Sequence, residues 1–278
     1  MKILITGISG FLGRNLISKL SEYELYGLDI QKEVLDGVKV FGSDNIEDIE
    51  INFDVVIICH AAVASGTTVL SNKILFDVNV SLTEKIVNKF NDAFIVYIST
   101  ASIYDINLDI VYEKSIINPQ SQYAISKYWG EKVVLNNKKS TIIRLSSLYG
   151  IGMKENTLIS NYINQALQNK VIQVWGKGER VQNYIHVSDV AKVIHLIIQN
   201  QQKFCGKLLL GVSKKEYSNL QIAQIIAKLT QSEIQFVNDD YSKSFCYNNN
   251  YTTNLLNWEI DTSIEERLQN YIEWKQKK

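Results

Sequence analysis

The sequence predicts an α/β protein with a Rossmann-type doubly wound parallel sheet and a smaller C-terminal lobe. Two observations lead to this fold class. Over the first 150 residues, short apolar runs alternate with segments whose apolar residues recur at helical spacing, as expected for parallel strands that helices cover on both faces. The first run is followed by a glycine-rich turn and a helical segment, which is how a dinucleotide-binding fold begins.

The first 150 residues are expected to contain six strands and three helices. The strands are placed at 2–6, 24–29, 38–41, 55–61, 94–99 and 141–145, and the helices at 11–20, 78–90 and 122–136. The runs at 55–61 and 94–99 are continuously apolar up to Cys59 and Ile98, which is typical of interior strands. Because ligands of such sheets lie at the carboxyl ends of the strands, residues 1–150 are expected to form a dinucleotide-binding domain, completed by about 183–210.

After residue 150 the pattern is mixed and the connections are more polar. Helices are expected at 159–167, 187–198, 220–229 and from about Ser263, with a short strand at 173–175 and a surface loop at 239–250. No internal repeat or long linker is visible. Residues 151–182 and 211–278 are therefore expected to form a substrate-binding lobe that packs directly on the first domain.

The composition restricts the classes of partner. Of the 278 residues 46% are apolar, enough for a large core, and the longest apolar stretch, 55–64, is too short to span a membrane. Lys plus Arg and Asp plus Glu both total 29, so a small molecule is a more fitting partner than nucleic acid or an anionic membrane. Cys59, Cys205 and Cys246 have no paired spacing, which argues against disulfides or a metal site and fits the reducing cytoplasm.

The glycine-rich turn reads Gly7-Ile8-Ser9-Gly10-Phe11-Leu12-Gly13. Glycines at this spacing let the backbone turn tightly and approach a pyrophosphate, which the amides at the start of the next helix would hold. The motif stands between a strand and a helix, and this context separates it from a glycine turn without a ligand. Gly7, Gly10, Phe11, Leu12 and Gly13 are therefore predicted to bind the cofactor.

Two aspartates follow the second and third strands. Asp29 lies 22 residues after Gly7, close to the spacing of about 20 for a carboxylate that binds the adenosine ribose. Since a carboxylate there repels a 2′-phosphate, NAD is favoured over NADP, although a surface aspartate that caps a loop is the alternative. Asp44 could reach the adenine, but Ser43-Asp44-Asn45 is also ordinary turn chemistry.

Tyr123 and Lys127 are four residues apart and so share one face of a helix. Free tyrosine, with a pKa of about 10, is a poor base near neutral pH, but an adjacent ammonium and an oxidised nicotinamide favour its phenolate. Tyr123 can then accept a proton from a substrate hydroxyl as hydride leaves the same carbon. Alone, this spacing is common on amphipathic helices; with the glycine turn upstream, it predicts a dinucleotide-dependent redox enzyme.

Three further polar residues follow interior strands. Thr100 could hydrogen-bond both the substrate hydroxyl and the Tyr123 oxygen, whereas Ser99 is expected to tighten the loop; capping of the strand end is the alternative for both. His60 lies in an apolar setting before Ala61-Ala62 and is expected to be a packed loop residue beside the cofactor.

In order and spacing, these motifs resemble the extended short-chain dehydrogenase/reductase family, especially its nucleotide-sugar epimerase and dehydratase branch. The similarity covers essentially the whole chain. The matching segments are Thr6 to Gly13, Asp29, His60-Ala61-Ala62, Asn79, Ser99 to Tyr104, Tyr123 to Lys127, Tyr149-Gly150, Gly176-Lys177-Gly178, Tyr184 to Val190 and Leu256-Asn257-Trp258.

The resemblance implies an NAD-binding domain, a sugar-binding lobe and a homodimer. It implies that Tyr123 is the acid/base, that Lys127 holds the nicotinamide ribose and that Thr100 assists. It also implies that His60, Ala61, Ala62, Asn79 and Ser99 lie along the cofactor. In the family the helix that carries the tyrosine forms the dimer interface. The contacts expected there are Tyr128, Trp129, Val133 and Val134. Ordinary packing of these side chains against the sheet is an equal alternative.

The segment after the strand at 94–99 helps to separate reactions within the family. Many sugar 4,6-dehydratases have an Asp-Glu pair there, where this chain has Thr100-Ala101-Ser102. This resembles the epimerases that oxidise C4 transiently with retained NAD, and the 4-ketosugar reductases that release their cofactor. A non-catalytic NAD-binding protein is a third reading, and the Thr100, Tyr123 and Lys127 set argues against it.

The chain departs from the family at two positions that bind the substrate's diphosphate. Ser147 stands where the family commonly has Asn, and Gln182-Asn183 stand where it has Arg-Asp. The loss of the arginine removes a charge-assisted bidentate site, for which Arg180 or Lys154 could compensate. Otherwise the substrate is a different nucleotide sugar, or a sugar without a nucleotide. Ser147, Arg180, Gln182 and Thr100 are expected to bind the substrate.

Overall fold

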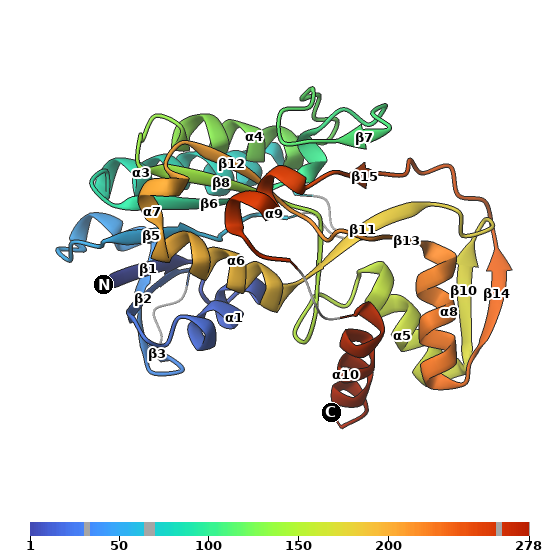
Figure 1. Ribbon diagram of the computed structural model, residues 1–278. Helices are drawn as coiled ribbons and strands as arrows, with labels where there is room; N and C mark the ends of the chain where they lie inside the picture. Colours follow the sequence, from blue (N-terminus) through green and yellow to red (C-terminus); the bar gives the residue numbers. More distant parts are fainter. Residues whose placement is uncertain (31–33, 64–69, 260–262, 278) are drawn as a thin grey trace.

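A mostly parallel sheet of eight strands forms the centre of the larger body (Figure 1). The computed structural model describes residues 1–30, 34–63, 70–259 and 263–277. The strand order is β12-β8-β6-β5-β1-β2-β4-β3, and only β3 runs antiparallel to its neighbour, so the predicted doubly wound sheet is confirmed. The strands are β1 (Lys2–Thr6), β2 (Glu24–Asp29), β3 (Val34–Leu35), β4 (Val38–Gly42), β5 (Val55–Ile58), β6 (Phe94–Thr100), β8 (Ser140–Leu145) and β12 (Lys207–Gly211).

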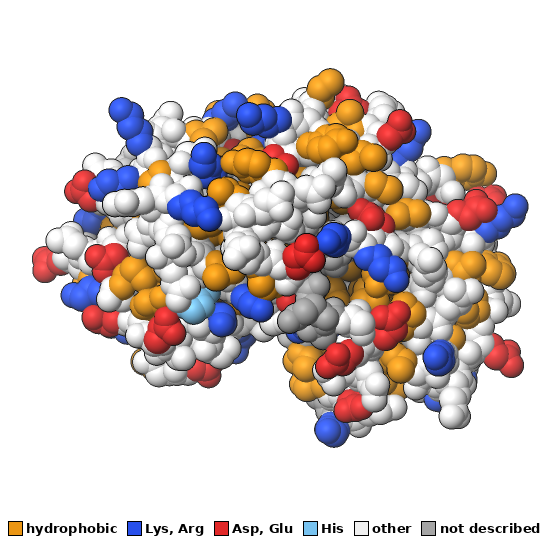
Figure 2. All heavy atoms as spheres, viewed as in Figure 1, with side chains coloured by type: hydrophobic (Ala, Val, Ile, Leu, Met, Phe, Trp, Pro, Cys, Tyr) orange, Lys and Arg blue, Asp and Glu red, His pale blue; other side chains and the backbone are white. Residues whose placement is uncertain are grey.

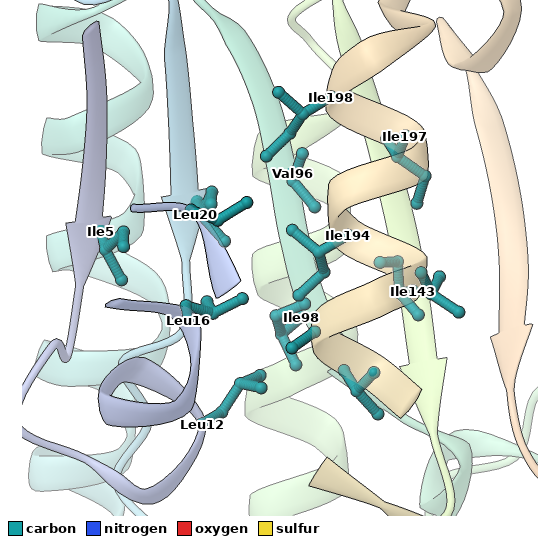
Figure 3. Packing of buried hydrophobic residues seen from close by; sticks show 14 of the residues in the cluster. Ile5, Leu12, Leu16, Leu20, Val96, Ile98, Ile143, Ile194, Ile197 and Ile198 are labelled. Atoms are coloured by element: carbon teal, nitrogen blue, oxygen red, sulfur yellow. The ribbon is translucent and has the colours of Figure 1, made fainter. Parts of the chain in front are cut away.

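Helices cover both faces of this sheet, as the apolar strands require. On one face α1 (Phe11–Lys19) and α6 (Val187–Gln199) pack against β1, β6 and β8, and Figure 3 shows their side chains meeting there. On the other face lie α2 (Asn72–Phe76), a π-helical turn η2 (Asp77–Ser81), α3 (Leu82–Lys89) and α4 (Gln122–Val134). Shorter helices in this body are η1 (Ser43–Asp48), η3 (Ala101–Ile103), α7 (Gln201–Phe204) and α9 (Asn250–Leu256).

The second lobe has its own apolar core. In it α5 (Leu158–Asn169), α8 (Asn219–Thr230) and α10 (Ile264–Gln276) pack with the parallel pair β10 (Val171–Trp175) and β14 (Glu233–Val237). A three-stranded sheet leads from one lobe to the other, with β11 (Val181–His186) between β9 (Ser147–Tyr149) and β13 (Glu216–Ser218). The domain boundaries expected from the sequence stay a prediction.

Three predicted elements are corrected by the structure. The strand predicted at 55–61 ends at Ile58, because the chain then turns so that His60 packs against Gly7. The helix predicted at 78–90 continues a helix that begins at Asn72, where the Ser71 hydroxyl accepts a bond from the Ile74 amide. The loop predicted at 239–250 contains strand β15 (Cys246–Tyr247), which pairs with β7 (Ile110–Val111).

The surface agrees with the balanced composition. On the face shown in Figure 2, cationic and anionic side chains are interspersed rather than gathered into a patch of one sign. In the part of the chain that the structure describes, no helix is long and apolar enough to cross a membrane.

Candidate active site

The glycine turn joins β1 to α1 in a conformation that requires glycine. Gly7 has φ +66°, and a Cβ atom there would lie 2.8 Å from the backbone of His60. A Cβ atom on Gly13 would lie 2.4 Å from the Gly7 carbonyl oxygen. Gly10 is the N-cap of α1 and has no side chain with which to cap the first amides of the helix. Amides at a helix N-terminus favour an anion.

Asp29, at the end of β2, forms hydrogen bonds with the same turn. Its carboxylate accepts bonds from the Ser9 amide at 2.9 Å, the Ser9 hydroxyl at 2.6 Å and the Ile30 amide at 2.8 Å. A carboxylate has about four acceptor positions, so the half-buried Asp29 can accept a further bond from a ligand hydroxyl. The role of Ser9 was not predicted, because it is visible only once β1 and β2 lie side by side.

Asp44 lies at the start of η1, directly after β4. It is exposed and lines a cavity of about 400 Å³ together with Asp77, Val78, Ser81 and Lys85. This places Asp44 near the carboxyl end of β4, and its contact with the adenine stays a prediction.

His60 is held by protein groups on both sides of its ring. Nδ1 lies 2.7 Å from the Thr6 hydroxyl, and Nε2 lies 3.1 Å from the Val78 carbonyl oxygen. Burial, with a smaller effect from Lys127, lowers the pKa of His60 to about 3. The ring is therefore neutral near pH 7 and has the packing role expected from the sequence.

Asn79 fixes the segment after β5 to the helix that carries Tyr123. It lies in the π-helical turn η2 and is fully buried. Its Oδ1 accepts from the Ala62 amide at 2.8 Å, and its Nδ2 donates to the Ala62 carbonyl at 3.1 Å and to the Ser126 hydroxyl at 2.9 Å. These bonds give Asn79 a supporting role, in which it shapes the crevice at Ala61-Ala62; its expected place along the cofactor stays a prediction.

Tyr123 and Lys127 lie one turn apart on α4, as predicted. The helix begins after Ser121, whose hydroxyl accepts a bond from the Ala124 amide. Burial raises the pKa of Tyr123 to about 12, and a hydrogen bond with Thr100 opposes this rise. Burial also lowers the pKa of Lys127 to about 7, against the opposing effects of Glu131 and Cys59. In the chain by itself, burial outweighs the lowering of the Tyr123 pKa that was expected from the ammonium.

Two more predicted site residues, Ser99 and Thr100, lie at the end of β6. The Thr100 hydroxyl accepts from the Ser102 amide at 3.2 Å and donates to the Ser102 hydroxyl at 3.0 Å. The Ser99 hydroxyl is buried and has no hydrogen-bond partner among the described residues. A buried hydroxyl without a partner is costly, so Ser99 is better explained by a bound ligand than by loop packing.

A cavity of about 410 Å³ opens between the two lobes beside Thr100. Within the described ranges its lining contains one cation, Arg180, and no carboxylate. Lys154 is exposed and does not line it. The lining of the cavity includes Thr100, Ser102, Ser147, Arg180, Gln182, Phe245 and Tyr247.

Gln182 and Asn183, which stand where the family commonly has Arg-Asp, form hydrogen bonds with other residues of the chain. Gln182 donates to the Asn219 side-chain oxygen at 2.8 Å. Asn183 accepts from the Ser146 hydroxyl at 2.8 Å and from the Ser213 amide at 2.9 Å. Arg180 directly precedes β11 and Gln182 lies in it, and both side chains line the same cavity.

Phe245 and Tyr247 were not predicted as site residues. They belong to the polar segment that was expected to be a surface loop, and the pairing of β15 with β7 brings them to the cavity. In the parts of the chain that the structure describes, no group of three or more His, Cys, Asp or Glu side chains could hold a metal ion.

Comparisons with known proteins identify the family of the chain. The model of the NAD dependent epimerase/dehydratase family matches residues 3–208. The chain is similar to a putative UDP-glucose 4-epimerase of Methanocaldococcus jannaschii, with 32% identity over 216 residues, 68% of this chain and 71% of that protein. It is also similar to the GDP-6-deoxy-D-talose 4-dehydrogenase of Aggregatibacter actinomycetemcomitans, with 26% identity over 252 residues, 84% of this chain and 82% of that protein.

Solved structures show the same fold. MoeE5 in complex with UDP-glucose and NAD superposes with a TM-score of 0.88 at 20% identity, over 100% of this chain and 99% of that one. The UDP-glucuronic acid 4-epimerase of Bacillus cereus in complex with NAD gives a TM-score of 0.85 at 21% identity, over 99% of both chains.

Proposed function

Because the chain belongs to the NAD-dependent epimerase/dehydratase family, and is therefore an enzyme that uses NAD, we propose that it is a nucleotide-sugar epimerase that oxidises and re-reduces C4 of its substrate. The observation that carries this proposal is the place of Thr100, which lines a cavity without a carboxylate in its described lining and lies close enough to Tyr123 to oppose the rise of the Tyr123 pKa. Removal of water from neighbouring carbons needs a second acid/base, so the lining favours epimerisation over dehydration.

The residues of the crevice fit NAD. The amides at the start of α1 would hold the pyrophosphate, Asp29 the adenosine ribose, Asp44 the adenine side and Lys127 the nicotinamide ribose. The buried, unpartnered Ser99 hydroxyl lies at the end of β6, next to Thr100, where the nicotinamide end of the crevice is expected. NAD held there would supply the hydride acceptor and donor for C4 of the sugar.

The chain itself moves the proton. Tyr123 accepts the proton of the 4-hydroxyl, with Thr100 hydrogen-bonded to the same oxygens, and gives it back when C4 is reduced. Since each pKa unit corresponds to about 1.4 kcal/mol, a fall of the Tyr123 pKa from about 12 toward neutrality needs the positive charges of Lys127 and of the oxidised nicotinamide together.

A ketosugar reductase is the second candidate, because the chain is also similar to a 4-dehydrogenase. Purified protein separates the two functions. An epimerase retains NAD through purification and interconverts the C4 epimers without net NADH formation or consumption. Stoichiometric NADH turnover with a 4-ketosugar would instead establish the reductase.

We expect Arg180 to bind the anionic part of the substrate. Its guanidinium makes only one long bond within the described chain, from Nε to the Lys243 carbonyl at 3.3 Å. Arg180→Ala should raise KM about 10- to 100-fold, as the loss of a charge-assisted bond of 1.5–3 kcal/mol implies, and leave kcat within about threefold. Steady-state kinetics with a UDP-sugar tests this, with Lys154→Ala as the matched control. An equal KM in both variants would show that the diphosphate does not bind at Arg180.

Two of the four residues expected at a dimer interface pack within the chain, as the alternative expectation has it. Val134 is fully buried in the core under α4, and Val133 packs partly against the same core. Trp129 is 53% exposed and packs edge-to-face on Phe76 of α2, which is 42% exposed. Of the four residues expected from the resemblance, Trp129 is thus the one that fits an interface best, and Phe76 joins it.

We propose a homodimer that buries this aromatic pair. Trp129→Asp should convert the dimer to a monomer, because loss of a central interface tryptophan costs about 2 kcal/mol or more. Light scattering after size exclusion measures this. Trp175→Asp, which changes a tryptophan of similar exposure (56%) on the other lobe, should leave the dimer intact. A wild-type protein that is monomeric at micromolar concentration would contradict the proposal.

A further inference from the structure

Lys127 is buried without an anionic partner. Its side chain is 2% exposed, and within the described ranges its ammonium forms neither an ion pair nor a hydrogen bond. The ammonium lies 4.1 Å from the centre of the Tyr97 ring. An ammonium over an aromatic face within about 6 Å is attracted by the quadrupole of the ring.

Tyr97 is itself fixed in place by α4. It lies on β6 with 0% exposure, and its hydroxyl donates to the Lys127 carbonyl oxygen at 3.4 Å. A Cβ atom on Gly130 would lie 2.1 Å from the Tyr97 hydroxyl. Glycine inside a helix is destabilising by about 1 kcal/mol relative to alanine, and here it provides the space that lets the Tyr97 ring lie beneath Lys127.

The titratable groups around Lys127 do not supply an unpaired negative charge. Burial raises the pKa of the Cys59 thiol to about 12 and keeps His60 neutral. Both carboxylate oxygens of Glu131 accept from Arg144, at 2.9 and 2.7 Å. The groups that face the ammonium are Cys59 and His60 after β5, Tyr97 on β6 and Glu131 on α4.

We propose that Tyr97 is a positioning residue whose aromatic face holds the Lys127 ammonium in place of a carboxylate. The ring stabilises the positive charge without cancelling it, because the ring has no net charge. The field of the ammonium therefore stays available to the Tyr123 phenolate. This last consequence rests on the proposed function, whereas the contact between Tyr97 and Lys127 does not.

The test compares aromatic rings at position 97 that have nearly the same shape but different quadrupoles. The pKa of Lys127 is measured by NMR titration of the protein carrying ¹³Cε-labelled lysine, with the signal assigned by Lys127→Arg. Tyr97→Phe should keep this pKa within about 0.3 units of the wild-type value. Replacement of Tyr97 by 3,4,5-trifluorophenylalanine should lower it by about 0.5 to 1 unit, since cation–π attraction is worth about 0.5–2 kcal/mol. An equal Lys127 pKa in the Phe and trifluorophenylalanine proteins would overturn the proposal.

The same variants separate this proposal from the proposed function. The trifluorophenylalanine protein should show an alkaline limb of the pH–rate profile that moves down together with the Lys127 pKa. If the pKa shifts and the profile does not, the contact is established and the role of Lys127 in catalysis is refuted. Trifluorophenylalanine at Tyr162, a tyrosine buried in the other lobe, is the control and should change neither quantity.

Discussion

Tyr123→Phe should lower kcat about 10²- to 10⁴-fold, the usual contribution of a positioned acid/base. The phenol oxygen is the group that exchanges a proton with the 4-hydroxyl in the proposed reaction, and its hydrogen bond with Thr100 is lost with it. The ring stays, so the packing of α4 and the binding of NAD should change little. Turnover and NAD affinity are measured on the same protein, and NAD affinity should stay within about threefold.

Tyr128→Phe provides the matched control for this prediction. Tyr128 lies on the same helix and is partly buried against a different core, and the proposed reaction gives its hydroxyl no part. Its loss should leave turnover within about twofold. A Tyr123→Phe protein that keeps more than about a tenth of wild-type turnover would contradict the assigned role.

Glu131→Leu should destabilise the fold by about 3–5 kcal/mol, the usual effect of leaving one partner of a buried ion pair alone. The Arg144 and Glu131 side chains are 3% and 1% exposed, and their closest atoms are 2.7 Å apart. Arg144 also donates to the Tyr104 hydroxyl at 2.8 Å and to the Glu113 carbonyl at 3.2 Å. These bonds hold the guanidinium in the interior when its counter-charge is removed. Denaturant unfolding measures the loss.

Two controls separate the buried charge from other effects. Combining Glu131→Leu with Arg144→Met should recover most of the stability, because an apolar pair often replaces a buried ion pair without loss. Glu259→Leu removes one partner of an exposed pair, where Lys214 and Glu259 are 65% and 64% exposed, and should cost at most about 1 kcal/mol. If the Glu131→Leu protein is no less stable than the Glu259→Leu protein, the Arg144 guanidinium has moved out to water and the prediction is contradicted.

The parts of the site that depend on near neighbours in sequence were predictable. The glycine turn is a local motif between a strand and a helix, and the pair Tyr123 and Lys127 follows from one turn of helix. The strands β5 and β6 were recognisable as interior strands because their residues are continuously apolar.

The parts that depend on packing between distant segments were not predictable. Arg144 meets Glu131 only because α4 lies on the face of the sheet that β8 helps to form. The sequence around 239–250 is polar, and its pairing with β7 depends on residues more than 100 positions away. Phe245 and Tyr247 therefore reach the cavity from a segment that resembles a surface loop.

The π-helical turn at Asp77–Ser81 escaped prediction for a different reason. An apolar period of 3.6 residues does not reveal one additional residue in a helix. The wider turn nevertheless carries Asn79, whose amide ties Ala62 to Ser126. The resemblance identified Asn79 as important, but its contacts required the structure.

Transient oxidation at C4 is tested most directly by following a deuterium label. UDP-glucose and UDP-glucuronic acid deuterated at C4 are incubated with the purified enzyme without added cofactor, and the products are examined by NMR together with absorbance at the NADH band. The account predicts C4 epimers that keep deuterium at C4 while the amount of NADH stays constant. Loss of the label to solvent, or NADH that accumulates in proportion to product, would contradict it.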